Sequence, residues 1–445
     1  MSILDKTRVL RGSLDSHAKE VVSGAAVAFF LKALGAALAF LFNIVIAREL
    51  GAEGTGVFYM ALTVFNIAAV LGTAGLDSAM LRFTSSNAAA GDWAGVRGVC
   101  RNGALIAVIA GSAASIVMFL CAPLAARLFH NEEVAGIVRI LSFAVMPMAL
   151  LVVNAGALNG LKRIRDSQIV YGAAVPGISL LLFYSAARAL GVEGAAWSYI
   201  LAVFAACALG FVFYGMAAKR YGSVKGSFDT GRLIRTSMPF FLVSAMHLVN
   251  GWANIILLGI FSTPEDVAVF NAALRTSMLA SLVLLAVNAI ASPKFSALYG
   301  QSDTGNLRRV AVGSTRLTVL AAAPMLIFFL MFPAWVLGLF GESFRAGAAA
   351  LVILTLGQII NTATGSTGQM LAMTGHELAL RNIIAASAAL NVVLNLVFIP
   401  VWGINGAAVA TAINVAVSTL LASYSVHARL GIRMDLFTRL ERARS

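Results

Sequence analysis

The chain has 445 residues, of which 60% are hydrophobic and 11% are charged. Soluble globular proteins carry about 25% charged residues, so the composition excludes a soluble globule and indicates an integral membrane protein. The net charge of +13 would suggest a nucleic-acid partner in a soluble protein. In a membrane protein the positions of the positive charges indicate the topology instead, and we expect no nucleic-acid partner.

Twelve stretches are apolar for long enough to cross a bilayer, which takes about 20 residues per helix because only intrahelical hydrogen bonds satisfy the backbone in hydrocarbon. In chain order they are residues 23–47, 55–76, 100–122, 134–158, 167–189, 194–217, 237–261, 267–290, 313–334, 348–373, 379–399 and 404–426. The remaining segments are an N-terminal arm (1–22), a linker (218–236) between two six-helix bundles (23–217 and 237–426), and a basic tail (427–445). The predicted fold class is an all-α membrane protein.

The positive charges are distributed unevenly about these spans. Of the 32 Lys and Arg residues, two lie inside spans and five lie on one side, which leaves 25 on the side that holds both termini. The five are Arg48, Arg127, Arg139, Arg188 and Arg345. Loops rich in Lys and Arg stay in the cytoplasm. The sequence therefore predicts a multi-pass protein with cytoplasmic termini, arm, linker and tail.

The two halves of the chain resemble each other at a shift of 212 residues. The pair VF at Val57 aligns with VF at Val269, and GVEGAA at Gly191 aligns with GINGAA at Gly403. Because each repeat has an even number of spans, the two repeats run in the same direction and are related by an axis along the membrane normal. We therefore expect two parallel six-helix repeats around a central cavity, working by alternating access.

Two cations lie inside predicted spans, Lys32 and Arg275. A cation at the centre of a membrane helix costs about 2.5–3.5 kcal/mol, so such a residue usually has a partner or a function. Both are positive, which favours an anionic ligand, and the planar guanidinium of Arg275 suits bidentate binding of phosphate. For Lys32 the alternative is that its long side chain reaches the headgroups.

Polar side chains at helical spacing form stripes on several spans, and we take them as candidate cavity-lining groups. They are Asn43, Tyr59, Thr63, Asn66, His247, Asn250, Asn254, Asn271, Gln358 and Asn361. The shift of 212 makes Thr63 the equivalent of Arg275. The alternative is that these side chains hold helices together, at about 0.6 kcal/mol for each hydrogen bond.

Carboxylates are missing from the middle of every predicted span, since all 19 Asp and Glu residues fall in arms, loops or helix ends. An exporter of cationic drugs usually needs such a carboxylate, because an uncompensated cation is too costly in a low dielectric. The sequence also lacks a phosphate-binding loop with its Lys, a metal-binding His/Glu pair and a Ser-His-Asp set. We expect no enzyme activity, no metal and no cofactor.

The motifs LGAEGTGVF at Leu50, GLDSAMLRF at Gly75 and the repeated GxxGAA resemble the polysaccharide flippases of the multidrug/oligosaccharidyl-lipid/polysaccharide exporter superfamily. The resemblance implies a bacterial inner-membrane protein that moves a polyprenyl-diphosphate-linked oligosaccharide from the cytoplasmic to the periplasmic leaflet, for O-antigen or exopolysaccharide synthesis. Lys32 and Arg275 fit a role in holding the diphosphate. Partners would be the lipid-linked glycan, membrane lipid and, in the pathway, a polymerase and glycosyltransferases.

Two other functions remain open from the sequence. One is a small-molecule or multidrug exporter of the same superfamily. The other is a non-transporting scaffold of a polysaccharide assembly complex, which would use the arginines of the tail to bind partners or anionic lipid. The tail arginines are Arg429, Arg433, Arg439, Arg442 and Arg444.

Overall fold

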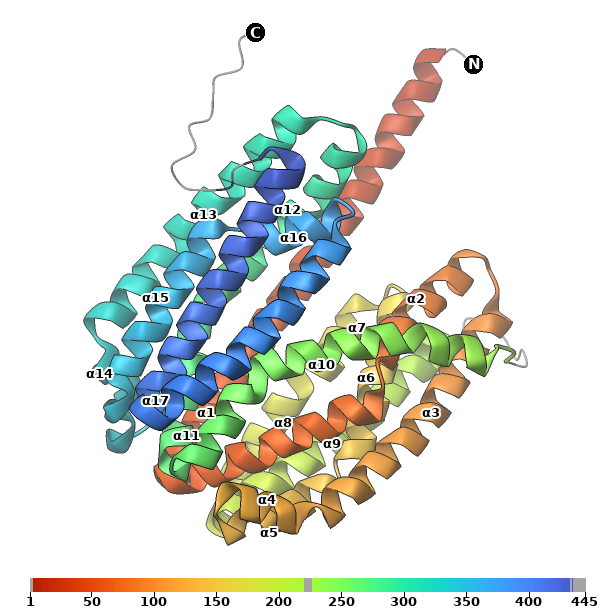
Figure 1. Ribbon diagram of the computed structural model, residues 1–445. Coiled ribbons are helices and arrows are strands. Elements are labelled where there is room, and N and C mark those ends of the chain that lie inside the picture. Colours follow the sequence, from red (N-terminus) through yellow and green to blue (C-terminus); the bar gives the residue numbers. More distant parts are fainter. Residues whose placement is uncertain (1–2, 220–225, 433, 435–445) are drawn as a thin grey trace.

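The computed structural model describes residues 3–219, 226–432 and 434, and within these ranges all regular secondary structure is helical (Figure 1). Helix α1 (Ile3–Thr73) bends at Gly51, which has φ 67° and ψ −175°. Helix α17 (Glu377–Leu430) bends in the same way at Gly403, with φ 53° and ψ −126°. Positive φ is readily adopted only by glycine, so each glycine divides a long helix into two arms.

The remaining helices of the N-terminal half lie between α1 and residue 218. They are α2 (Leu76–Ala89), α3 (Trp93–Leu120), α4 (Ala122–Phe129), α5 (Glu132–Ser142), α6 (Val145–Gly160), α7 (Ile164–Gln168), η1 (Ile169–Ala174), α8 (Val175–Leu182), η2 (Phe183–Ala187), η3 (Arg188–Leu190) and α9 (Gly191–Ala218). Those of the C-terminal half precede α17. They are α10 (Thr230–Phe261), α11 (Pro264–Met278), α12 (Ala280–Gly300), α13 (Thr304–Met331), α14 (Pro333–Gly338), η5 (Glu342–Gly347), α15 (Ala348–Thr364) and α16 (Thr367–Met373).

The all-helical membrane fold predicted from composition is confirmed. In the described part of the chain, nine helical segments are long and apolar enough to cross a membrane, or up to ten when the bent pair of α5 and α6 counts as one. Two of these segments each contain two arms, joined at Gly51 and Gly403. The exact count of twelve crossings stays a prediction.

Several predicted helices are interrupted. The span 134–158 is divided into α5 and α6, which meet at 49°, and Pro147 lies in the first turn of α6, where a missing N–H costs nothing. The span 267–290 runs from α11 into α12 through Leu279, whose backbone is helical, whereas the span 348–373 is divided at Gly365, whose φ is 66°. The span 167–189 contains two π-helical segments, η1 and η2. Apolar periodicity does not reveal such breaks.

Residues 3–22 of the expected arm belong to α1, and residues 230–236 of the expected linker belong to α10, while the domain boundaries stay predictions. Helix α10 begins early because the Asp229 side chain caps it, accepting the N–H of Gly231 at 2.8 Å. Of the predicted tail, residues 427–430 continue α17, whereas Arg433 and residues 435–445 lie outside the described residues.

The internal repeat appears in the backbone. Gly191 has φ 60° and ψ −133°, which nearly equal the angles of Gly403 at the shift of 212 residues. Asp92 caps α3 and Asp303 caps α13, each accepting a backbone N–H three residues on, at 2.8 and 3.0 Å. Hydrogen bonds from Asn306 hold the pKa of the Asp303 carboxyl below its usual value. The two parallel repeats predicted from the sequence are therefore present.

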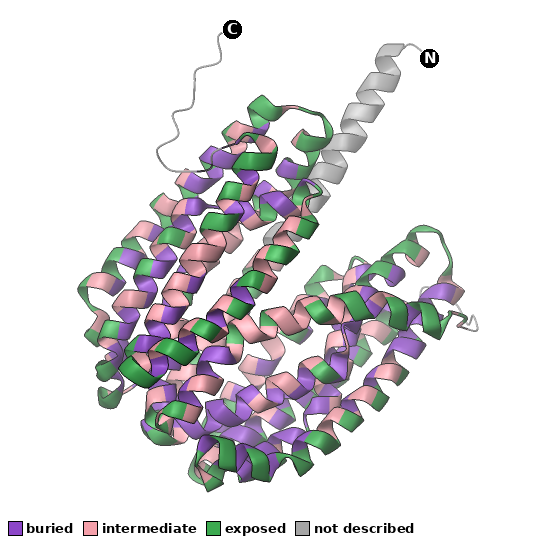
Figure 2. Ribbon diagram, in the orientation of Figure 1, coloured by how far each residue is buried: buried purple, intermediate pink, exposed green. Residues whose placement is uncertain are grey.

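The helices form two groups that meet near Gly51 and diverge toward the opposite end of the molecule (Figure 1). Buried residues concentrate inside each group, as Figure 2 shows. The meeting point is closely packed: a Cβ added at Gly56 would lie 1.8 Å from the Pro264 carbonyl oxygen. Arg48 donates to the Leu339 carbonyl at 2.7 Å, and the rings of Phe40 and Phe340 are 5.5 Å apart. We call this end the sealed end.

Candidate functional site

Arg275 lies in the last turn of α11, four residues before Leu279, through which the helix continues into α12. Its guanidinium carbon is 5.4 Å from the centre of the Trp252 ring on α10, a distance suited to a cation–π contact. Tyr59, on the second arm of α1, lies near Arg275 and Asn271. Helices from both halves of the chain therefore surround this cation.

Two polar atoms in this cluster are buried without a hydrogen-bond partner in the described structure, the Nε of Arg275 and the Oδ1 of Asn271. Leaving a buried donor or acceptor unsatisfied costs about 1–3 kcal/mol, and more when it is charged. Such a cost is maintained where a ligand or an ordered water completes the site. The cluster around Arg275 thus has the unsatisfied donor and the positive charge that an anion would need.

A network of amides joins α10 to both arms of α17. Asn250 accepts from Asn414 at 3.2 Å through its side-chain oxygen, and its backbone carbonyl accepts from Asn391 at 3.2 Å. Asn254 donates to the Thr411 hydroxyl at 2.7 Å and accepts from Asn395 at 2.9 Å. The network fixes α10 against α17 through side chains that carry no charge.

Three amides of this network, Asn391, Asn395 and Asn414, were not predicted from the sequence, and all three are buried. The signal that could have found them is the four-residue spacing of Ser387, Asn391 and Asn395 along one face of an otherwise apolar span. Ser387 belongs to the network too, since its hydroxyl donates to Asn414 at 2.8 Å.

A cavity of about 600 Å³ lies inside the C-terminal half, beside this network. Its polar lining consists of amides, hydroxyls and one imidazole, and none of the described lining residues is an Asp, Glu, Lys or Arg. The principal polar lining residues are His247, Asn250, Asn288, Asn361, Gln369 and Asn414. Amides offer both donors and acceptors, so the lining can hydrogen-bond a neutral ligand with many hydroxyls.

A second cavity, of about 310 Å³, lies between the first arm of α1 and α12. It contains Lys32, and it shares Asn288 and Gln369 with the larger cavity. The Oδ1 of Asn288 is buried without a hydrogen-bond partner in the described structure. The two cavities therefore adjoin, and the smaller one brings a cation to the edge of the amide-lined space.

Other predicted residues lie elsewhere. Asn43, Thr63 and Asn66 each donate to the carbonyl four residues earlier in α1, at 2.5, 2.8 and 2.6 Å. Gln358 accepts from Ser281 and from Asn361, both at 3.1 Å. Arg275 does not line either of the two cavities. The structure thus brings together His247, Asn250 and Asn361, and places Lys32 beside them.

Metal binding finds no support in the described residues, among which no group of three or more His, Cys, Asp or Glu could hold an ion. The three cysteines are all free, with Cys100 and Cys207 buried and Cys121 exposed. The chemistry that this arrangement offers is binding by amides and cations.

Relatives of the chain are found by sequence. A probable low-salt glycan biosynthesis flippase, Agl15 of Haloferax volcanii, is 26% identical over 414 residues, which cover 92% of this chain and 84% of the relative. The uncharacterized membrane protein MJ1068 of Methanocaldococcus jannaschii is 22% identical over 422 residues, covering 89% and 82%. Both relatives are archaeal proteins.

Solved structures share the fold. An inward-facing multidrug resistance MATE family transporter of the MOP superfamily has a TM-score of 0.77 at 17% identity, covering 92% of this chain and 98% of that one. The lipid II flippase MurJ in an inward closed conformation has a TM-score of 0.73 at 14% identity, covering 91% and 87%. At these identities the likeness shows the fold alone.

The family model for polysaccharide biosynthesis proteins matches residues 21–299, more than half of the chain. The match includes all of the N-terminal repeat and extends through α12, so it contains both Lys32 and Arg275. Together with the apolar spans, it identifies a multi-pass membrane protein. The chain belongs to the polysaccharide biosynthesis protein family.

Proposed function

We propose that the chain is a flippase, a transporter rather than an enzyme, that moves a polyprenyl-diphosphate-linked oligosaccharide across the membrane. The observation that carries this proposal is the pair of adjoining cavities, one lined by amides and the other containing Lys32. A lipid-linked oligosaccharide has the matching parts, because its sugars present hydroxyls and its diphosphate presents negative charge. Membership of the family and the likeness to Agl15, a probable flippase, support the same function.

The cytoplasmic side is assigned by charge. The side poor in positive charge is the sealed end, which contains Arg48, Arg188 and Arg345. Arg48 donates a hydrogen bond to Leu339, and Arg188 pairs with Glu49 at 3.4 Å, close to the bend at Gly51. The loops rich in Lys and Arg lie at the opposite end, where the helix groups diverge. In our proposal both termini are cytoplasmic and this conformation faces inward.

The two cations then act at different depths. Lys32 lines a cavity between α1 and α12, where a diphosphate that enters from the cytoplasmic leaflet would arrive first. Leu284 lines the larger cavity. Arg275 lies nine residues before Leu284 in the sequence and therefore closer to the sealed end. We propose that Arg275 receives the diphosphate as the sealed end opens and the cytoplasmic end closes.

Outward movement of a diphosphate is favoured electrically. Each negative charge that leaves a cell with an inside-negative potential gains about 2.3 kcal/mol per 100 mV. Phosphate groups also gain from the bidentate donors of an arginine, and the Nε of Arg275 has no hydrogen-bond partner in the described structure. The proposed cycle therefore needs no nucleotide hydrolysis by this chain.

A multidrug exporter is the second candidate, and the observation that favours it is the fold shared with a MATE transporter. The lining of the two cavities disfavours it, because their described residues include amides and Lys32 but no carboxylate for a cationic drug. The scaffold hypothesis is disfavoured by the same cavities, which a scaffold does not require.

Deletion of the gene in its own host tests the proposal. We expect the surface glycan to disappear and a lipid-linked intermediate facing the cytoplasm to accumulate, with both effects reversed by the wild-type gene. A bilayer-partition assay on the accumulated lipid shows which leaflet holds it. Normal surface glycan in the deletion strain, with lost resistance to cationic drugs, would establish the exporter instead.

A further inference from the structure

A third cavity, of about 730 Å³, lies on the N-terminal half and shares no residue with the two cavities described above. Helix α6 provides its floor, and α3 and α9 provide its sides. The flipping of the glycan does not involve this cavity in our proposal, so its lining needs a separate explanation. We call it the α3–α9 groove.

The walls of the α3–α9 groove are mostly apolar. They include Ala104 on α3, Leu150 and Val153 on α6, and Phe211 on α9. Phe211 is 46% exposed, which is expected of a side chain that faces the bilayer. A groove with such walls on the lipid-facing side of a helix bundle fits a hydrocarbon chain.

One end of the groove is cationic. Arg97 and Arg101 both line it from the first turns of α3, four residues apart and therefore on one face of the helix. This end belongs to the cytoplasmic side of the proposed topology. None of the described residues that line the groove is an Asp or Glu. Two guanidinium groups at this depth match a phosphate at the membrane surface.

A third polar group lies deeper in the same groove. Asn154 on α6 is 7% exposed, and its Nδ2 is buried without a hydrogen-bond partner in the described structure. An unpartnered amide donor in an apolar wall is costly, and an acceptor oxygen would satisfy it. The linkage oxygens between a lipid headgroup and its chains lie just below the phosphate, which is the arrangement that Arg97, Arg101 and Asn154 present.

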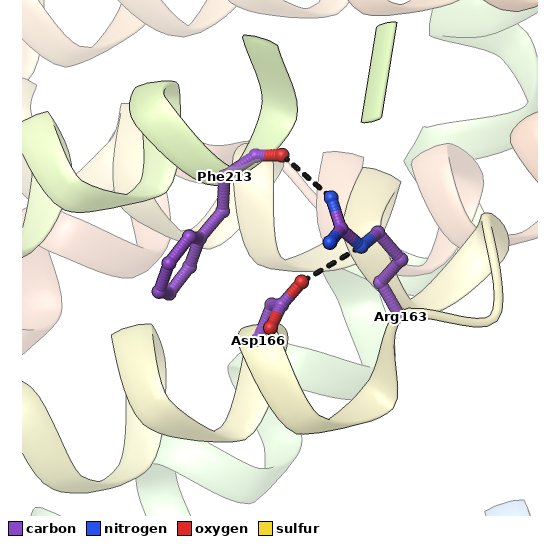
Figure 3. Close-up of polar contacts among 3 residues, drawn as sticks. All are labelled: Arg163, Asp166 and Phe213. Carbon is purple, nitrogen blue, oxygen red and sulfur yellow. Dashed lines mark hydrogen bonds and ion pairs between the residues drawn. The ribbon is translucent and has the colours of Figure 1, made fainter. Parts of the chain in front are cut away.

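The far side of the groove is fixed in place. Arg163, at the turn between α6 and α7, pairs with Asp166 at 2.8 Å and donates to the Phe213 carbonyl of α9 at 3.1 Å (Figure 3). These contacts join α9 to the α6–α7 turn. On α9 they are made by Phe213, one residue before Tyr214, which lines the groove. The charge of Arg163 is therefore used within the protein, and the groove is preformed.

We propose that the α3–α9 groove binds an anionic phospholipid of the cytoplasmic leaflet. Its phosphate lies between Arg97 and Arg101, a linkage oxygen accepts from Asn154, and one hydrocarbon chain lies along α6. The polyprenyl phosphate of the cargo has similar chemistry. The bilayer phospholipid is the occupant because the groove is separate from the cavities that contain Lys32 and the amides.

Native mass spectrometry of the full chain in detergent, titrated with lipid, tests this inference. Phosphatidylglycerol is expected to bind at least tenfold more tightly than phosphatidylcholine. The double substitution of Arg97→Gln and Arg101→Gln is expected to weaken phosphatidylglycerol about 25-fold, since each cation contributes about fivefold. Ala104→Phe, which fills the apolar wall, is expected to weaken it as well. Arg165→Gln, an exposed arginine on α7 outside the groove, is the control and should bind as the wild type does.

Three results would overturn the inference. One is equal binding of phosphatidylglycerol by the wild type and the double variant, and another is equal binding of phosphatidylglycerol and phosphatidylcholine. The third is displacement of phosphatidylglycerol by an equimolar amount of undecaprenyl phosphate, which would assign the groove to the carrier lipid. The melting temperature of each variant verifies its fold. If the double variant does not fold, the single substitution Arg101→Gln, at an exposed residue, replaces it in the titration.

Discussion

The two halves of this protein share a backbone but differ in the chemistry of their interiors. In the C-terminal half, Asn254 and Asn395 form part of a buried amide network, and Asn414 extends it. At the shift of 212 residues the N-terminal half has Phe42, Phe183 and Ala202 in their places, all buried. The two repeats therefore have similar helices and turns, while the contacts between helices are apolar at these positions in one repeat and hydrogen-bonded in the other.

The same difference separates Thr63 from Arg275, which are equivalent positions. The Thr63 hydroxyl is satisfied by the Tyr59 carbonyl at 2.8 Å, whereas the Nε of Arg275 has no hydrogen-bond partner in the described structure. Nearly all the lining of the amide-lined cavity and of the smaller cavity with Lys32 also comes from the C-terminal half, with α1 adding the segment around Lys32. In our proposal the C-terminal repeat therefore supplies most of the cargo site, with the first arm of α1 adding Lys32.

The largest effect is expected at Arg275. Arg275→Ala should lower the rate of glycan flipping in reconstituted liposomes by about 30-fold or more, because loss of a buried charged partner costs at least about 2 kcal/mol. Arg275→Lys should retain an intermediate rate, since it keeps the charge and loses the planar fork. The matched control is Thr63→Ala in the other repeat, which should flip at the wild-type rate. Equal losses at the two positions would show that the repeats contribute alike.

The equivalent pair Phe183 and Asn395 should differ in stability. Phe183→Ala removes a fully buried ring and should destabilise the protein by about 3 kcal/mol. Asn395→Ala removes hydrogen bonds to Asn254 and Asn391 and should cost about 1 kcal/mol, because such bonds within membranes are weak. Unfolding in mixed micelles measures both. A larger loss at Asn395 would mean that the amide network, and not apolar packing, dominates the stability.

How far the sequence could predict this structure depends on the kind of feature. The apolar spans, the repeat and the two intramembrane cations follow from composition and spacing. The break at Gly365 and the pairing of Asn250 with Asn414 do not, because they depend on which helix faces which. His247, Asn250 and Asn361 were predicted from polar spacing and lie together at one cavity, whereas Arg275 was predicted from its charge inside an apolar span and lies outside that cavity. The spacing of polar residues identifies the polar face of a helix, but it does not identify the helix or cavity that this face contacts.

The glycines that bend the chain test the similarity between the repeats. Gly191→Ala and Gly403→Ala each force a side chain into a backbone region with positive φ, which costs about 1–3 kcal/mol. Since the two backbones nearly coincide, the two substitutions should lower the melting temperature in detergent by similar amounts. A large fall in melting temperature for one substitution and none for the other would show that the two repeats differ at this bend.

The smallest effect is expected at Lys32, which is exposed and lines the smaller cavity. Lys32→Gln should reduce flipping about fivefold, equal to about 1 kcal/mol for one cation near the membrane surface, and mainly by weakening the capture of substrate. The concentration of substrate that gives half-maximal flipping should rise while the maximal rate changes little. A fall in the maximal rate alone would place Lys32 in a later step.

The most direct test of the central claim, that the C-terminal half and Lys32 recognise an anionic glycolipid, is a comparison of two cargoes in liposomes containing the wild-type protein. One cargo is the polyprenyl-diphosphate-linked oligosaccharide, and the other has the same lipid and sugars joined without phosphate. We predict rapid flipping of the first and little flipping of the second. Equal flipping of both cargoes would contradict the claim, since the cations would then have no part in recognition.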